Sequence, residues 1–268
     1  MTDSVLNVVL GLTASAISAA LGWLAQNLRR RRRLGRVREF FGMPDGSDCL
    51  LVVNRHTASA SSKSVSRGDV FALMELAGLV QECGARPEIV AHDEVRQGLG
   101  HRAEFCLGGP VSNDRTAAHL VSWLPGVTFT AEPDRPFGET ITVGDDHYRY
   151  LRPSETPGGR VYVLLARLRT GHGGRPAFLI AGQTATSNHA AVRYLVAHHR
   201  ELARKHGTDG TFALVLQLIN SSAYGPDLVE PVADVTRRAL ARPVEAAGAT
   251  TAGATPAPLP AQSSPPAS

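Results

Sequence analysis

Residues 49–54 read CLLVVN, and after a hydroxyl-rich loop residues 69–83 read DVFALMELAGLVQEC. The first run is almost continuously apolar, which is typical of a parallel strand buried on both faces. The second run places apolar residues at helical spacing, namely Val70, Leu73, Met74, Ala77 and Val80. Gly84 stands where such a helix would end. A buried strand followed by an amphipathic helix indicates an α/β fold.

The alternation continues along the chain. Further strands are expected at 88–91, 104–107, 127–130, 161–169, 177–181 and 212–219, and further helices at 187–205 and 228–240. Residues 139–143 and 147–152 flank the turn Gly144-Asp145-Asp146 and predict an antiparallel hairpin. We therefore predict one domain over residues 39–242, with a Rossmann-like, mostly parallel sheet and an antiparallel hairpin extension.

Ahead of this domain lies an apolar segment. Residues 5–28 read VLNVVLGLTASAISAALGWLAQNL and contain no charged side chain. About 20 residues of helix cross the hydrocarbon core of a bilayer, so residues 1–28 are predicted to form a single transmembrane helix. The basic juxtamembrane segment 29–38 follows it, and positive charge tends to stay in the cytoplasm. This order predicts a single-pass protein of the cell membrane with a cytoplasmic domain and membrane lipid as a partner.

The alternative for this segment is an amphipathic or core helix followed by a solvated basic face. A basic run would be attracted to anionic headgroups in either case. At the other end, residues 243–268 are rich in proline and alanine and predict a disordered tail.

The positive charge is concentrated in one place. The chain has 28 Lys+Arg against 24 Asp+Glu, and seven of the basic residues lie between positions 29 and 38. Subtracting them leaves 21 basic and 24 acidic residues, a balance of −3. A nucleic-acid-binding surface needs distributed basic residues, so no nucleic acid is expected as a partner. The three cysteines exclude a disulfide-stapled scaffold and agree with a reducing compartment.

Two loops resemble each other. Residues 107–121 (LGGPVSNDRTAAHLV) and 180–196 (IAGQTATSNHAAVRYLV) each run from a buried strand through glycine to a Ser-Asn pair and an alanine-rich helix. Such a pair arises from duplication of a βα unit or from two similar solutions to one turn. Free amides at a helix start attract phosphate or carboxylate groups, and ligands of open α/β sheets bind at the carboxyl ends of strands.

The loop after the first strand, residues 54–67, also carries hydroxyl and basic side chains. We expect these three loops to bind a small anionic ligand, a nucleotide or phosphorylated metabolite. The candidate contacts are Arg55, Gly108, Gly109, Ser112, Asn113, Gly182, Thr186 and Ser187. The alternative reading of each loop is a helix cap without a ligand. No dinucleotide or P-loop glycine motif is present, so the cofactor stays unassigned.

Catalytic groups are not recognisable in the sequence. Cys106 precedes Gly108 but lies in an apolar strand, which favours a core position over a nucleophile. Carboxylates at Glu75, Glu82, Asp93 and Glu94 have the spacing of a solvated surface. We therefore expect a ligand sensor, and two alternatives stay open: a membrane-associated hydrolase or transferase that processes nucleotides, and a non-catalytic assembly protein that forms homo-oligomers.

Overall fold

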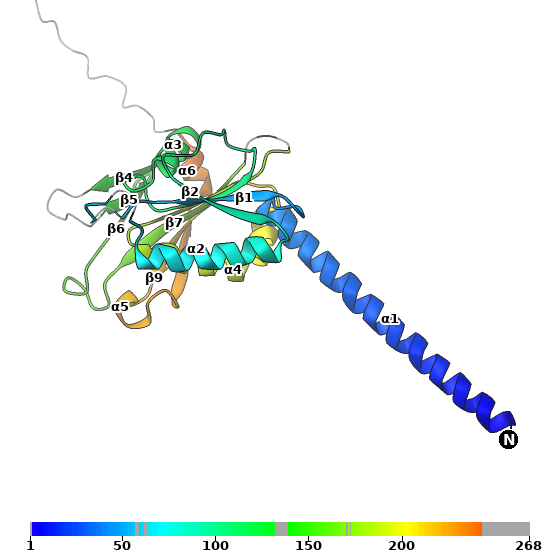
Figure 1. Ribbon diagram of the computed structural model, residues 1–268. Helices are drawn as coiled ribbons and strands as arrows, with labels where there is room; N and C mark the ends of the chain where they lie inside the picture. The colour runs from blue at the N-terminus through cyan, green and yellow to red at the C-terminus, as the bar shows by residue number, and fades with distance from the viewer. Residues whose placement is uncertain are drawn as a thin grey trace, which may run out of the picture.

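The computed structural model describes residues 2–56, 59–61, 64–131, 139–169, 171 and 173–242. A seven-stranded sheet forms the centre of the domain (Figure 1), with the order β10-β9-β7-β8-β3-β1-β2. Its strands are β1 (Asp48–Val53), β2 (Arg86–Ala91), β3 (Ala103–Leu107), β7 (Val161–Leu168), β8 (Ala177–Gly182), β9 (Phe212–Leu218) and β10 (Val229–Asp234).

Five of the seven strands run in the same direction. β1 pairs in parallel with β2 and β3, and β3 pairs in parallel with β8. β7 lies antiparallel between β8 and β9, and β10 lies antiparallel to β9 at the edge. The prediction of a mostly parallel sheet in an α/β domain is therefore confirmed.

The predicted hairpin belongs to a second, smaller sheet. β4 (Val127–Ala131), β5 (Glu139–Val143) and β6 (Asp146–Arg149) form this antiparallel sheet in the order β4-β5-β6. The antiparallel hairpin predicted from residues 139–143 and 147–152 is confirmed as β5 and β6, but it lies in this separate sheet and does not extend the main one. Ile141 and Val143 instead pack against apolar side chains of one face of the main sheet.

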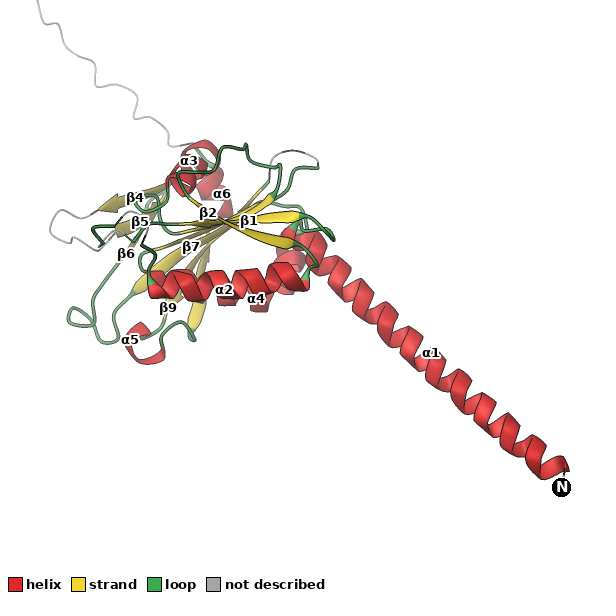
Figure 2. Ribbon diagram, viewed as in Figure 1, coloured by secondary structure: helices red, strands yellow, loops and turns green. Residues whose placement is uncertain are grey.

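Helices cover both faces of the main sheet (Figure 2). α2 (Arg67–Glu82) and α4 (Ala185–His206) pack side by side on one face. α3 (Asp114–Trp123) and α6 (Thr236–Leu240) share the other face with the small sheet. A four-residue helix, α5 (Ser221–Tyr224), lies between β9 and β10.

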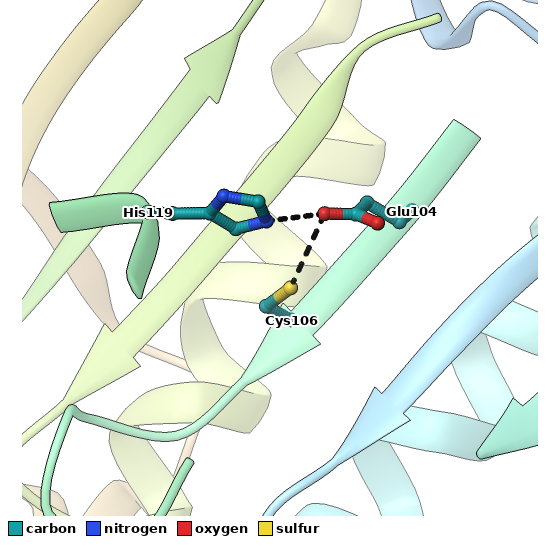
Figure 3. A group of neighbouring side chains, drawn as sticks. All are labelled: Glu104, Cys106 and His119. Carbon is teal, nitrogen blue, oxygen red and sulfur yellow. Dashed lines mark hydrogen bonds and ion pairs between the residues drawn. The ribbon is translucent and has the colours of Figure 1, made fainter. Parts of the chain in front are cut away.

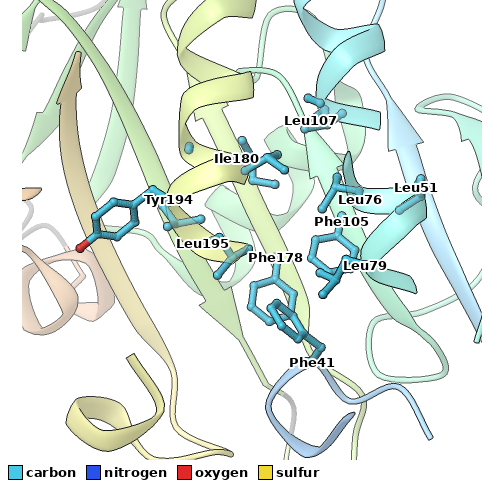
Figure 4. Packing of buried hydrophobic residues seen from close by; sticks show 14 of the residues in the cluster. Phe41, Leu51, Leu76, Leu79, Phe105, Leu107, Phe178, Ile180, Tyr194 and Leu195 are labelled. Atoms are coloured by element: carbon cyan, nitrogen blue, oxygen red, sulfur yellow. The ribbon is translucent and has the colours of Figure 1, made fainter. Parts of the chain in front are cut away.

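Two apolar cores follow from the alternation of side chains along the buried strands. Leu51 of β1 points into the core beneath α2 and α4, whereas its neighbours Leu50 and Val52 belong to the opposite core. Figure 4 shows the first core, where Phe105 and Phe178 stack with ring centroids 4.9 Å apart. Both faces of β1 and β3 are thus buried, as the sequence of these strands predicts.

The predicted helix at 228–240 is wrong in its first half. Residues Val229–Asp234 form the edge strand β10, and only Thr236–Leu240 are helical. Pro231 cannot donate a backbone hydrogen bond, which an edge strand tolerates. Pairing with the open edge of β9 therefore overrides the helical apolar spacing of this segment.

The longest element is α1 (Thr2–Phe41), a helix of 40 residues that projects away from the domain (Figure 1). It runs without a break through the predicted anchor and the basic segment. Within the described residues, no helix is both long enough and apolar enough to cross a bilayer, so the predicted transmembrane helix gains no support. The C-terminal turn of α1 enters the first core, where Phe40 and Phe41 are fully buried. The predicted tail at 243–268 lies outside the described residues.

Candidate functional site

The carboxyl ends of β1, β3 and β8 lie next to one another in the sheet. The chain leaves β1 toward α2 on one face, and it leaves β3 toward α3 on the other face. Ligands of open α/β sheets bind where neighbouring connections diverge in this way. We call the residues at this place, Asn54, Arg55, Gly108, Gly109 and Glu139, the carboxyl-edge site.

Gly108 brings the first two loops into contact. Its φ of +96° lies in the region that favours glycine. A Cβ atom added there would lie 2.6 Å from Asn54 Cβ and 2.7 Å from Ser112 Oγ. The Arg55 amide donates to the Ser112 carbonyl at 3.0 Å, and the Gly108 amide donates to Ile180 of β8 at 2.9 Å. The loops after β1 and β3 therefore do converge.

Asp69 connects these loops to the third one. Its buried carboxylate accepts hydrogen bonds from Asn54 Nδ2 at 3.1 Å, Ser66 Oγ at 3.0 Å and Asn188 Nδ2 at 2.7 Å. Asn188 Oδ1 in turn accepts from the Gly182 amide at 2.8 Å. Three donors hold this carboxylate, so its role is to fix the three loops relative to one another.

Two polar groups at the carboxyl-edge site have no hydrogen-bond partner among the described residues. Asn54 is 8% exposed, and its Oδ1 is buried without a hydrogen bond among the described residues. The amide orientation is fixed because Nδ2 donates to Asp69. Within the same part of the chain, the Gly109 amide donates to no acceptor. An unsatisfied buried polar atom costs about 1–3 kcal/mol, so the site favours a bound group that pairs with Asn54.

Glu139 adds a carboxyl group on the other side of the glycine turn. A Cβ atom added to Gly109 would lie 3.1 Å from Glu139 Oε2 and 3.8 Å from the Gly182 carbonyl. Burial raises the pKa of the Glu139 carboxyl group. The Gln183 side chain holds this segment by donating to the Glu139 carbonyl at 2.6 Å. The second glycine of the turn thus faces a carboxyl group at close range.

Several predicted ligand contacts are occupied by the protein itself. Asn113 is fully buried and caps α3, accepting from the Thr116 amide at 3.0 Å. Ser112 Oγ donates to the Gly109 carbonyl at 3.1 Å. Ser187 forms a reciprocal capping box with Thr184 at the start of α4. Thr186 lies in the first turn of the same helix. The polar atoms of Asn113, Ser112 and Ser187 are therefore used for local structure.

Four residues were not selected from the sequence: Asn54, Asp69, Glu139 and Asn188. Asn54 directly follows an apolar strand, a position that could have drawn attention to it. Asp69 and Asn188 stand 119 positions apart and meet only through tertiary structure. Glu139 begins a strand of the other sheet, and no local pattern distinguishes it.

A second cluster of ionisable groups is buried beneath α3 (Figure 3). Glu104 and Cys106 lie two residues apart on β3 and share a face with His119 of α3. Glu104 forms an ion pair with His119 and accepts from Arg115 Nη2 at 2.8 Å and Arg115 Nε at 3.3 Å. Burial opposes ionisation of Glu104, but its hydrogen bonds with His119 and Arg115 hold the pKa below its usual range.

This cluster has the donor types of a transition-metal site, since one atom each of Glu104, Cys106 and His119 lie within 4.8 Å of one another. However, the Arg115 guanidinium already neutralises the carboxylate, and a metal ion would have to displace it. Burial raises the pKa of the Cys106 thiol well above its ordinary value, so the sulfur is a poor ligand and a poor nucleophile. The arrangement fits a charge-compensated structural cluster.

Comparisons of the chain with protein-family models, with curated proteins and with solved structures gave no match.

Proposed function

We propose that the α/β domain binds a small phosphorylated ligand, a nucleotide or phosphorylated metabolite, at the carboxyl-edge site. The observation that carries the proposal is the buried Oδ1 of Asn54, which has no partner among the described residues. It stands at the divergence of two βα connections, where α/β domains bind ligands. A hydroxyl or amino group of the ligand would donate to this oxygen.

The phosphate would meet the donors of the same site. The Gly109 amide is free within the described chain, and glycine leaves room for close approach. Arg55 is exposed, and its guanidinium makes one long contact, 3.4 Å to the Val111 carbonyl. Arginine can bind phosphate with two parallel hydrogen bonds. A ligand with both a phosphate and a hydrogen-bond donor therefore fits better than a simple anion.

We further propose that α1 holds this domain at the cytoplasmic face of a membrane. The support is the set of large apolar side chains exposed along α1: Leu10, Leu12, Ile17, Leu21, Trp23, Leu24 and Leu28. A solvent-exposed set of this size favours transfer to an apolar environment. The absence of a recognisable catalytic set favours a sensor over an enzyme.

The ligand proposal can be tested by a thermal-shift screen of the full chain in detergent against nucleotides and phosphorylated metabolites. A ligand at 100 times its Kd stabilises the folded state by about 2.7 kcal/mol. Arg55→Gln should weaken a hit by about tenfold, because a charge-assisted hydrogen bond contributes about 1.5–3 kcal/mol. Arg237→Gln, which removes the same charge from exposed α6, is the matched control.

Gly109→Val tests the approach to the turn. Its side chain would occupy the space between Gly109 and Glu139, so binding should be lost, and thermal unfolding of the free variant establishes that it is folded. Full affinity in both Arg55→Gln and Gly109→Val would disprove the site. A blank screen on folded protein would favour the assembly alternative.

A further inference from the structure

A basic groove lies between the last third of α1 and the C-terminal half of α4. Its volume is about 780 Å³, within the range of small-molecule sites. We call it the α1/α4 groove, and its lining contains Arg29, Arg33, Arg36, Val37 and Phe40 from α1 and His199, Arg200, Ala203, Arg204 and Thr208 from α4 and the loop after it. The arginines follow helical spacing on each helix, so each helix turns a basic stripe toward the groove.

Among the described residues that line the groove there is no carboxylate. Among the described residues, none of these five arginines forms an ion pair, although surface arginines elsewhere, such as Arg38 and Arg86, are paired with carboxylates. Acidic side chains adjoin the lining at Glu39, which accepts from Thr208 Oγ1 at 2.8 Å, and at Glu201 and Asp209, which are next in sequence to Arg200 and Thr208. Five guanidinium groups around one groove repel one another, and a bound anion would relieve this repulsion.

His199 supplies an independent sign of a ligand. Its Nδ1 donates to the Val196 carbonyl at 2.7 Å, which leaves Nε2 as the second ring nitrogen. Nε2 is buried and has no partner among the described residues. The ring lies against Phe40 and Phe41, with centroids 6.2 Å and 5.7 Å away. Because Nδ1 carries the proton, Nε2 of the neutral ring is an acceptor, so a hydroxyl group of a lipid headgroup, rather than a phosphate oxygen, would pair with it.

The groove also has an apolar part and a defined position. Val37 and Phe40 are buried at its base. Along α1 the groove residues come directly after the exposed apolar residues Leu24 and Leu28. They belong to the end of α1 that meets the domain, and Figure 1 shows the course of this helix. If the apolar part of α1 lies in a bilayer, the groove lies at the level of the phospholipid headgroups.

We propose that the α1/α4 groove binds the phosphate headgroup of an anionic phospholipid. The arginines of both helices hold the phosphate, and the buried side chains of Val37 and Phe40 form the apolar base beneath it. This inference rests on the membrane part of the proposed function but not on the carboxyl-edge site. It predicts selectivity for anionic over zwitterionic lipid, because five arginines and no carboxylate are among the described residues that line the groove.

The test is native mass spectrometry of the full chain in detergent micelles, titrated with phosphatidylglycerol or phosphatidylcholine. The expected result is retention of phosphatidylglycerol in preference to phosphatidylcholine by at least tenfold. Arg200→Gln/Arg204→Gln should abolish this preference, because the two substitutions remove the positive charge that α4 contributes to the groove. Arg31→Gln/Arg32→Gln removes the same charge from the basic run outside the groove lining and should keep the preference.

Each of the following outcomes would overturn a stated part of the proposal. Equal retention by wild type and Arg200→Gln/Arg204→Gln overturns the groove site, and equal loss in both double variants shows general attraction to the basic run. Competition by glycerol 3-phosphate at the affinity of the lipid would assign the groove to a soluble phosphate compound and overturn the lipid assignment. Flotation of the chain with phosphatidylcholine vesicles tests the membrane association of α1 separately, so the two failures are distinguishable.

Discussion

The guanidinium carbon of Arg167 lies 4.5 Å from the centroid of the Phe40 ring, inside the domain. Arg167 is fully buried on β7, and Phe40 belongs to the last turn of α1. The guanidinium donates to the carbonyls of Gly207, Thr208 and Gly210, which follow the end of α4. One side chain therefore joins the central sheet, the first helix and the end of the fourth.

Replacing Arg167 should destabilise the domain strongly. Burial lowers the pKa of Arg167 to about 10, so the side chain still carries its charge at neutral pH. Arg167→Met keeps apolar contact with Phe40 but leaves three carbonyls without a donor, and we expect a loss of about 3 kcal/mol in the free energy of unfolding. Denaturant unfolding of the full chain measures it. Arg237→Met on exposed α6 should change it by less than about 0.5 kcal/mol, and equal effects would contradict the role of Arg167.

The Glu104 cluster should make stability depend on acid pH. The folded-state pKa of Glu104 is lowered, so its contribution is present above the unfolded value and is lost as pH falls through the folded value. Glu104→Gln should cost about 3–5 kcal/mol at pH 7, since it leaves Arg115 and His119 without their carboxylate. Unfolding measured from pH 7 to pH 3 should be less pH-dependent in Glu104→Gln than in wild type.

Glu88→Gln is the control for that experiment. Glu88 pairs with Arg102 at the surface, where an ion pair contributes at most about 1 kcal/mol. If the free energy of unfolding depends on pH between pH 7 and pH 3 as strongly in Glu104→Gln as in wild type, the buried cluster does not control stability in acid.

The thiols should be unreactive in the folded protein. Cys49, Cys83 and Cys106 are all buried, and burial raises the pKa of each, in Cys83 to about 11. Ellman's reagent at pH 8 should therefore detect no thiol in native protein and three in denatured protein. Rapid modification of Cys106 without unfolding would reopen the possibility of a catalytic thiol.

The two glycines of the turn should differ in their tolerance of alanine. Gly108 has a positive φ and no space for a Cβ atom beside Asn54, so Gly108→Ala should lower the free energy of unfolding by about 1–3 kcal/mol. Gly109 lacks a positive φ, and its nearest neighbour would be the flexible carboxyl group of Glu139. Gly109→Ala should fold normally. Equal destabilisation would mean that Gly109 is structural and unsuited to ligand approach.

The strands and helices of the domain centre could be predicted because each has a local cause. CLLVVN is apolar enough to identify β1, and the helical spacing from Val70 to Val80 identifies α2. The predicted apolar face is only partly right, because Val70 and Met74 are exposed, whereas Ala72, Leu76 and Leu79 are buried. β10 could not be identified, because the edge of β9 that attracts it is a tertiary feature. The placement of the hairpin failed for the same reason, since Ile141 and Val143 are directed by a partner surface.

The candidate site could be predicted only as a region. The carboxyl ends of β1, β3 and β8 follow from the strand pattern, and the structure does bring Arg55, Gly108 and Ser112 together. The sequence does not show which polar atoms at this site are left without a hydrogen bond. Asn113 and Ser187 have the residue types of both a cap and an anion contact, and only their hydrogen bonds distinguish the two. The unpaired oxygen of Asn54 is a property of three-dimensional packing.

Because α1 is one continuous helix, a movement of its N-terminal end is transmitted to the domain. Forty helical residues at 1.5 Å each span about 60 Å, and the helix contains no proline. Its far end is fixed in the core through Phe40 and Phe41. A tilt of about 10° in its first half would displace the domain by about 10 Å. Any reorientation of the N-terminal end by a force or a partner would thus be transmitted to the domain through one continuous helix.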